Sequence, residues 1–344
     1  MNESLMQPDE VRHHAERANA VLDELDRILL GRNDLHRMVV IGILARGHIL
    51  LEGVPGLGKT ALAKALGDIL GLQLKRVQFT PDLMPGDILG TNILQETSGG
   101  QRTFQFQPGP VFTNVLLADE INRASPKTQS ALLEAMQERA VTMFGVTRAL
   151  PSPFFVLASQ NPIEFEGTYP LPEAQIDRFL FKLQVLGLDA DVLDEIISTR
   201  RRGEPPEPRA RLTPADLDEL FAAVDRVFLP RAVSRYIARL VAATHGNAVE
   251  TIGKYVSLGA SPRAAIALAE AGRAQALLSG RPSVGFEDVR RVAHAVMNHR
   301  LILNYRARLD GVHAHQILDG LLGSVDETEM NLPDDVVVRG SARA

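Results

Sequence analysis

The sequence contains no cysteine and no long apolar run, and each absence excludes a class of protein. Without cysteine, the chain cannot form disulfides, use a catalytic thiolate or bind a metal through a thiolate. No apolar segment approaches the roughly 20 residues that a membrane-spanning helix requires. Residues 1–18 are polar and lack the apolar stretch of a secretory signal. We therefore expect a cytoplasmic protein without a membrane span.

The sequence also lacks an excess of basic residues. The net charge is −5 and the pI is about 6.0, which argues against a nucleic-acid or membrane-surface footprint. This balance does not exclude a basic pore in an assembly. Apolar residues make up 45% of the 344 positions, enough for a sizeable core. A chain of this length is typical of two domains.

One glycine-rich stretch carries a specific chemical signal. The segment "GVPGLGKT" fits the phosphate-binding pattern G-x-x-x-x-G-K-[ST], here called the P-loop. An apolar strand at His48–Glu52 should precede it and a helix at Lys59–Leu70 should follow it. Backbone N–H groups can converge on phosphate oxygens only where side chains are small, and the helix N-terminus favours the anion. The predicted nucleotide-binding residues are Gly53, Val54, Pro55, Gly56, Leu57, Gly58, Lys59 and Thr60.

Further short apolar segments alternate with helical ones and predict a parallel α/β sheet. Helices are expected at Val11–Leu30, through Val39–Ala45, and after Ser125-Pro126. The other expected strands are Leu74–Phe79, Val115–Asp119, Phe154–Ser159 and Phe179–Val185.

Polar residues follow two of these strands and suggest hydrolysis rather than binding alone. Thr60 and Asp119 are the expected ligands of Mg²⁺, and Glu120 is the expected base for the attacking water. Asn161, after the next strand, could orient that water. Lys59 would place its charge between the β- and γ-phosphates.

Three arginines are candidates for stabilising transition-state charge. Arg178 precedes the last expected strand, Arg263 follows Ser261-Pro262 in the first turn of a helix, and Arg123 follows the acidic pair. An arginine at a helix N-terminus opposes the helix dipole, which hints at a function. We expect one of them to act from a neighbouring subunit.

The chain divides near Gly187, where the strands end and a charged, proline-rich segment, Arg200–Pro214, follows. We predict an α/β core over 1–187, a helical domain over 188–323 without further strands, and a loosely attached tail over 324–344. Thr213-Pro214, Ser261-Pro262 and Phe286-Glu287 should begin helices. Two β-hairpins, Thr91–Gln107 and Ala140–Leu150, should interrupt the core near 88–112 and 140–150.

Together these residues resemble an AAA+ ATPase, and three long segments are similar to the MoxR family. The segments are Phe79–Gly90, Asn122–Glu138 and Ala158–Phe179, within a resemblance spanning about Ile28 to Leu303. The resemblance implies a P-loop NTPase core with sheet order 5-1-4-3-2, followed by an all-α lid domain.

The resemblance also implies roles for individual residues. The first hairpin matches the helix-2 insert. Asn161 matches the first sensor, Arg178 the arginine finger and Arg263 the second sensor. Gly31 and Arg32 fall where such proteins contact adenine by backbone. The implied cofactors are ATP and Mg²⁺.

The family implies a homo-oligomeric ring, often a hexamer, that works with a von Willebrand factor A domain protein to remodel a client protein. Two other interpretations stay open at this point. Related rings with similar hairpins translocate DNA, and Arg102 and Arg148 are the obvious basic residues in the two hairpins. The second of these is a nucleotide switch that binds ATP without hydrolysing it.

Overall fold

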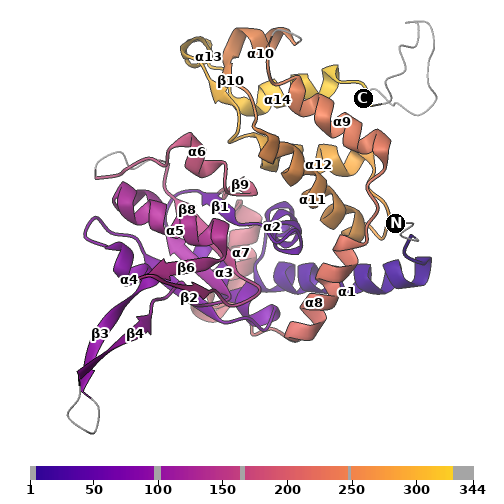
Figure 1. The fold of residues 1–344 in the computed structure, drawn as a ribbon. Coiled ribbons are helices and arrows are strands. Elements are labelled where there is room, and N and C mark those ends of the chain that lie inside the picture. The colour runs from indigo at the N-terminus through magenta and orange to yellow at the C-terminus, as the bar shows by residue number, and fades with distance from the viewer. Residues whose placement is uncertain (1–4, 97–101, 163–166, 247–248, 328–344) are drawn as a thin grey trace, which may run out of the picture.

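Five parallel strands form the central sheet of this computed structural model, which describes residues 5–96, 102–162, 167–246 and 249–327 (Figure 1). They are β1 (Ile49–Glu52), β2 (Leu74–Gln78), β5 (Val115–Asp119), β8 (Phe155–Gln160) and β9 (Phe181–Gln184). Their order is β2-β5-β8-β1-β9. Numbered along the chain, this is 5-1-4-3-2, so the order implied by the resemblance is confirmed.

Both faces of the sheet are buried because successive residues of a strand point to opposite sides. On β1, Leu51 packs in the same apolar cluster as helices α1 (Pro8–Ile28), α2 (Asn33–Leu44) and α3 (Lys59–Ile69). Leu50, one residue earlier, packs with the other cluster, which contains α5 (Pro126–Glu138) and the short α4 (Pro85–Leu89). The central strands β1, β5 and β8 are accordingly buried along almost their whole length, as the sequence indicated.

Two antiparallel hairpins extend from this core, as predicted. The first pairs β3 (Gly90–Glu96) with β4 (Arg102–Pro108) and projects from the body of the protein (Figure 1). Its predicted turn falls on residues 97–101, outside the described part of the chain. The second pairs β6 (Ala140–Met143) with β7 (Val146–Ala149). The Arg148 guanidinium lies 3.9 Å from the Phe106 ring centre and so links the two hairpins.

The C-terminal part is helical, with one correction to the prediction. Helices begin after Thr213, after Ser261 and at Phe286, as expected. Two short strands, β10 (Val256–Leu258) and β11 (Ile302–Leu303), nevertheless form an antiparallel pair. The expectation of no strand after Gly187 is therefore wrong, because strands of three and two residues are too short to show alternation. In the core, the remaining helix is α6 (Glu173–Ile176), and Ile121–Arg123 forms a 3₁₀ turn. After β9 the helices are α7 (Ala190–Thr199), α8 (Pro214–Asp225), α9 (Arg231–Ala242), α10 (Glu250–Tyr255), α11 (Pro262–Leu278), α12 (Phe286–Met297), α13 (Tyr305–Leu309) and α14 (Ala314–Ser324), with a 3₁₀ turn at Arg201–Gly203.

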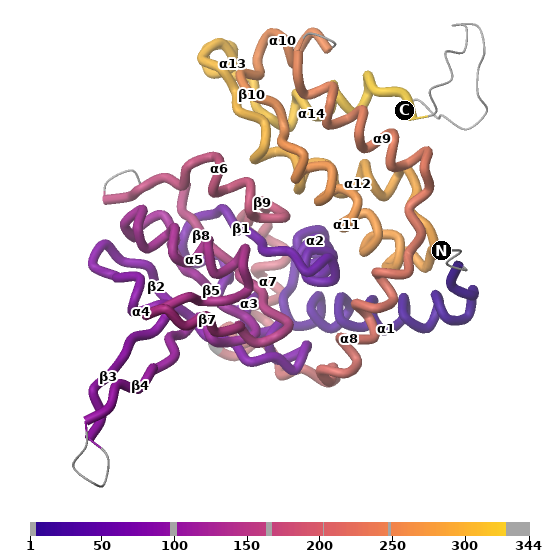
Figure 2. The backbone as a smooth tube through the Cα atoms, in the orientation of Figure 1, coloured from indigo at the N-terminus to yellow at the C-terminus, as the bar shows by residue number. Residues whose placement is uncertain are grey.

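The N-terminal and C-terminal parts share one apolar cluster. Figure 2 shows α1 running beside α11, and buried side chains of both helices belong to the cluster that covers one sheet face. The division at Gly187 stays a prediction, and the predicted tail lies mostly outside the described residues. No helix in the described part of the chain combines the length and apolarity needed to span a membrane.

A buried histidine in this core predicts acid sensitivity. His48, immediately before β1, is 8% exposed and packs against α5 and β8: its Nε2 lies 3.1 Å from the Met136 carbonyl, and its Nδ1 accepts from the Val156 N–H at 3.0 Å. Burial lowers the pKa of His48 from 6.5 to about 4. The unfolded chain therefore binds a proton at this histidine more readily than the folded chain does. The contribution of neutral His48 to the free energy of unfolding is complete above pH 6.5 and is lost as the pH falls toward 4.

We expect the free energy of unfolding to fall by about 2 kcal/mol between pH 7 and pH 5 from His48 alone. His299, whose pKa burial also lowers, adds a loss of the same sign. Urea unfolding at both pH values measures the change. In His48→Gln, which retains an acceptor and a donor, the drop should be smaller by that amount. An equal drop in both proteins would contradict the assignment to His48.

Candidate active site

The P-loop lies between β1 and α3 and depends on glycine at three positions. Gly56 and Gly58 have φ angles of +83° and +78°, a left-handed conformation that other residues rarely adopt. At Gly53 a Cβ would lie only 2.7 Å from the Val185 backbone oxygen. The sequence therefore uses glycine twice for backbone conformation and once for close approach, which leaves backbone N–H groups open to an anion at the start of α3.

Lys59 and Thr60 begin the helix that follows the loop. Lys59 is 8% exposed, and its Nζ donates a 2.5 Å hydrogen bond to the Gly53 carbonyl. Burial lowers the pKa of Lys59, while Asp119, Glu120 and Glu52 raise it. These carboxylates therefore favour the charged amine. Thr60 is exposed in the first helical turn.

A cavity of about 450 Å³ lies beside the P-loop. Arg32 lines it and braces the loop: its Nη1 donates to the Leu57 carbonyl at 2.6 Å, and its Nη2 donates to the Leu186 carbonyl at 3.0 Å. Gly31 adjoins the cavity and is covered by Val192 of α7, with φ +78°. The other lining residues are mostly apolar and include Leu29, Leu30, Leu35, Leu62, Val185, Leu193 and Ile196. An apolar cavity next to a phosphate-binding loop suits a purine ring.

The predicted acidic pair stands at the end of β5 and is held by a buried serine. Ser159 Oγ donates to Asp119 Oδ1 at 2.5 Å and accepts from the Glu120 N–H at 2.9 Å. Arg76 of β2 donates to the other oxygen, Asp119 Oδ2, at 2.8 Å. One side chain of β8 thus orients both acids of the neighbouring strand.

Glu120 has an unusual backbone. Its φ and ψ are 56° and 49°, the left-handed region, which costs a non-glycine residue about 1 kcal/mol. Its Oε2 accepts from Gln78 Nε2 at 2.7 Å and from Arg123 Nη1 at 3.0 Å. Two polar side chains thus hold the carboxylate that follows β5.

Strand register brings the P-loop, Asp119 and Asn161 to one edge of the sheet. Glu52 pairs with Gln160, so the P-loop begins level with Asn161, which is 6% exposed. Ala118 pairs with Ala158, so Asp119 lies level with Ser159. This carboxyl edge is where α/β sheets bind ligands. The predicted lysine, acids and amide therefore converge.

Arg178 and Arg263 do not join them. Ile49 pairs with Phe181, so Arg178, before β9, lies at the opposite edge of the sheet. The stretch over which β1 and β9 pair is about 10 Å long, so the two edges of the sheet lie at least that far apart. Arg178 Nη1 donates to the Leu133 carbonyl at 2.9 Å, and both arginines line a second cavity of about 280 Å³.

Comparisons with known proteins identify the family. The chain is 42% identical to the chaperone MoxR1 of Mycobacterium tuberculosis over 322 residues, covering 93% of this chain and 84% of the relative.

This chain belongs to the MoxR family of AAA+ ATPases.

Other relatives and the domain-level matches support that placement. The Bacillus subtilis protein YeaC is 40% identical over 88% of this chain and 92% of its own length, and the MoxR protein of Methylorubrum extorquens is 32% identical over 89% and 92%. Residues 48–181 match the ATPase family associated with various cellular activities, and residues 250–321 match the AAA lid domain. A Cytophaga hutchinsonii crystal structure superposes with a TM-score of 0.84 at 40% identity, covering 92% of this chain and 97% of that one.

Several residues of this MoxR site were not predicted from the sequence. Ser159 and Gln78 contact the acidic pair, yet a serine inside a strand and a glutamine at a strand end give no local signal. Helix α7 lines the cavity beside the P-loop through Leu193 and Ile196. Its apolar spacing could reveal a helix, but not that the helix returns to the P-loop.

Proposed function

We propose that this MoxR-type protein hydrolyses ATP to ADP and phosphate with Mg²⁺. The observation that carries the proposal is the convergence of the P-loop, Asp119, Glu120 and Asn161 at one edge of the sheet. In this proposal the loop N–H groups and Lys59 bind the phosphates, and the base occupies the apolar cavity beside Gly31 and Arg32.

Thr60 and Asp119 supply hydroxyl and carboxylate oxygens, the donors that Mg²⁺ prefers. The described residues contain no group of three or more His, Cys, Asp or Glu suited to a metal, which fits an ion completed by phosphate and water. When bound, Mg²⁺ would neutralise charge on the β- and γ-phosphates. Ser159, which donates to Asp119, would keep that carboxylate oriented.

Glu120 would act as the general base toward the attacking water, and Asn161 would orient that water. The hydrogen bonds from Gln78 and Arg123 to Oε2 would fix the position of the carboxylate before the water attacks. The two carboxylates would thus have separate roles: that of Glu120 would accept the proton, and that of Asp119 would bind the ion.

The arginines would complete the site from a neighbouring copy. Arg178 and Arg263 lie at the sheet edge opposite the P-loop of their own chain, so neither can reach its phosphates there. A ring, with a hexamer as the expected size, would place this edge against the neighbour's nucleotide. Arg178 would act as the arginine finger and Arg263 as the second sensor.

Hydrolysis in such a ring would drive chaperone-like remodelling or maturation of a client protein in the cytoplasm, with a von Willebrand factor A domain protein as partner. The M. tuberculosis relative is named a chaperone, which supports a protein client. The projecting first hairpin exposes Leu94 and Phe104 as apolar contact residues, and its Arg102 lies 3.9 Å from Glu96, which offsets its charge.

Phosphate release tests this proposal. With ATP and Mg²⁺ we expect turnover that EDTA abolishes and excess Mg²⁺ restores. Because each site needs a neighbour's arginine, turnover per chain should rise with protein concentration until the ring is saturated. Turnover insensitive to EDTA would refute the metal assignment, and turnover per chain independent of concentration in a monomer would refute the shared site. Stimulation by DNA that weakens with salt would favour the nucleic-acid motor instead.

A further inference from the structure

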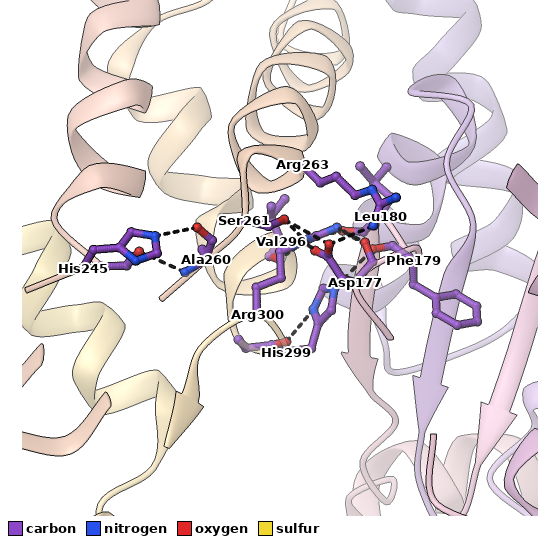
Figure 3. A network of polar contacts seen from close by, with 12 residues as sticks. Asp177, Phe179, Leu180, His245, Ala260, Ser261, Arg263, Val296, His299 and Arg300 are labelled. Atoms are coloured by element: carbon purple, nitrogen blue, oxygen red, sulfur yellow. Dashed lines mark hydrogen bonds and ion pairs between the residues drawn. The ribbon is translucent and has the colours of Figure 1, made fainter. Parts of the chain in front are cut away.

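Asp177, immediately before Arg178, receives several contacts from the C-terminal helical part (Figure 3). Its Oδ1 accepts from Arg300 Nε at 2.8 Å, and its Oδ2 accepts from Arg263 Nη1 at 3.3 Å. Ser261 Oγ lies 3.1 Å and 3.0 Å from the two oxygens. Ser261 precedes α11 yet does not cap it with its hydroxyl. A serine that sequence rules assign to a helix cap is thus committed to Asp177.

Arg300 binds the same turn through its whole guanidinium. Only 3% of its side chain is exposed. Besides the Asp177 carboxylate it donates to the backbone carbonyls of Asp177 at 3.1 Å, Phe179 at 2.7 Å and Leu180 at 3.2 Å, and to that of Val296. Such a buried, multiply bonded pair is costly to break, because it leaves an uncompensated charge. The turn before β9 is therefore fixed to the end of α12.

Arg178 lies in the middle of this fixed turn. The carbonyls on both sides of it, those of Asp177 and Phe179, accept from Arg300 Nη2. Its own guanidinium makes one bond, from Nη1 to Leu133, and its buried Nε has no partner within the described part of the chain. The direction of Arg178 therefore depends on where Arg300 holds the backbone.

Arg263 is held more loosely beside it. Its side chain is 52% exposed, and its bond to Asp177 is long at 3.3 Å, so an incoming anion can replace that bond. The surrounding cavity carries excess positive charge. Among its described lining residues Asp177 is the sole acid, against the arginines Arg46, Arg139, Arg178, Arg263 and Arg300.

We propose that Asp177, anchored by Arg300, is a positioning residue that presents Arg178 and Arg263 as one unit to the phosphates of a neighbouring copy. The helical lid and the arginine site then move together, so a shift of the lid in one subunit changes hydrolysis in the next. This inference rests on the proposed function, because it requires that the arginines act on a neighbour's ATP.

Mixed assemblies test the inference through an asymmetry. Full-length Glu120→Gln chains supply arginines but cannot hydrolyse, and Arg178→Ala chains keep a working P-loop but lack the finger. Mixing them should restore ATP turnover at each interface where a Glu120→Gln chain supplies its arginines to the P-loop of an Arg178→Ala chain. Asp177→Asn placed in the Glu120→Gln chain should lower the restored kcat about tenfold or more, since small misplacements of catalytic groups cost up to about 100-fold. The same substitution in the Arg178→Ala chain should leave it unchanged.

A purely structural role would lower turnover equally in both placements, and equal loss or no loss would overturn the inference. Absence of rescue in the parent mixture would instead refute action in trans and, with it, this inference. Asn298→Ala is the matched control, because Asn298 bonds the Lys182 carbonyl at the same junction without touching Asp177. It should leave rescue unchanged in either chain. If Asp177→Asn does not fold, Ser261→Ala should show the same asymmetry at about threefold.

Discussion

Replacing Glu120 by glutamine is expected to lower kcat for ATP at least about 100-fold, the usual contribution of a general base. Glutamine keeps the size of the side chain and can still bond Gln78, but it cannot take a proton from water. ATP affinity should change less than about threefold, because the P-loop and Asp119 provide the binding contacts in our account. Phosphate release measures kcat, and a fluorescent nucleotide measures affinity.

Glu134→Gln is the control for that substitution, because Glu134 is an exposed residue of α5. Its kcat should equal that of the unmodified protein. If Glu120→Gln retains full turnover, Glu120 is not the base. If it loses ATP binding as well as turnover, its role is in the nucleotide site rather than in the chemical step.

Replacing Arg178 by alanine is expected to lower kcat about 1,000-fold, the lower end of what an arginine finger contributes. Its own ATP affinity should stay nearly unchanged, because Arg178 lies at the opposite edge of the sheet from its own P-loop. Folding should survive, since within the described part of the chain the guanidinium makes one bond, to the Leu133 carbonyl. Steady-state turnover and nucleotide titration of the purified variant measure both quantities.

Arg12→Ala, at an exposed position of α1, controls for loss of an arginine and should behave as the unmodified protein. A fall in ATP affinity in proportion to kcat would place Arg178 at its own nucleotide. A kcat within threefold of the unmodified value would remove it from catalysis.

The sheet and the P-loop could be predicted from the sequence because their signals are local. Apolar runs such as Val115–Asp119 mark buried strands, and glycine spacing marks the turn that binds phosphate. Strand order came from the family resemblance and is confirmed. The short pair β10–β11 was missed because its few residues carry no period.

Contacts between distant parts of the chain gave no such signal. Arg300 reaches Asp177 across 123 positions, and neither residue stands in a pattern that predicts the pairing. Ser159 orients Asp119 only because β5 and β8 are neighbours in the sheet. Sequence therefore identified the residues proposed to do chemistry more readily than those that hold them in place, since holding depends on tertiary packing.

In the proposed ring each active site is shared between two chains. Mixing Glu120→Gln with Arg178→Ala protein and measuring ATP turnover tests it most directly, because neither chain alone has both a working base and a finger. We expect turnover well above the sum of the two separate variants, rising to a maximum near equal proportions. Turnover equal to that sum at every ratio, with both variants confirmed in the same assembly, would contradict it.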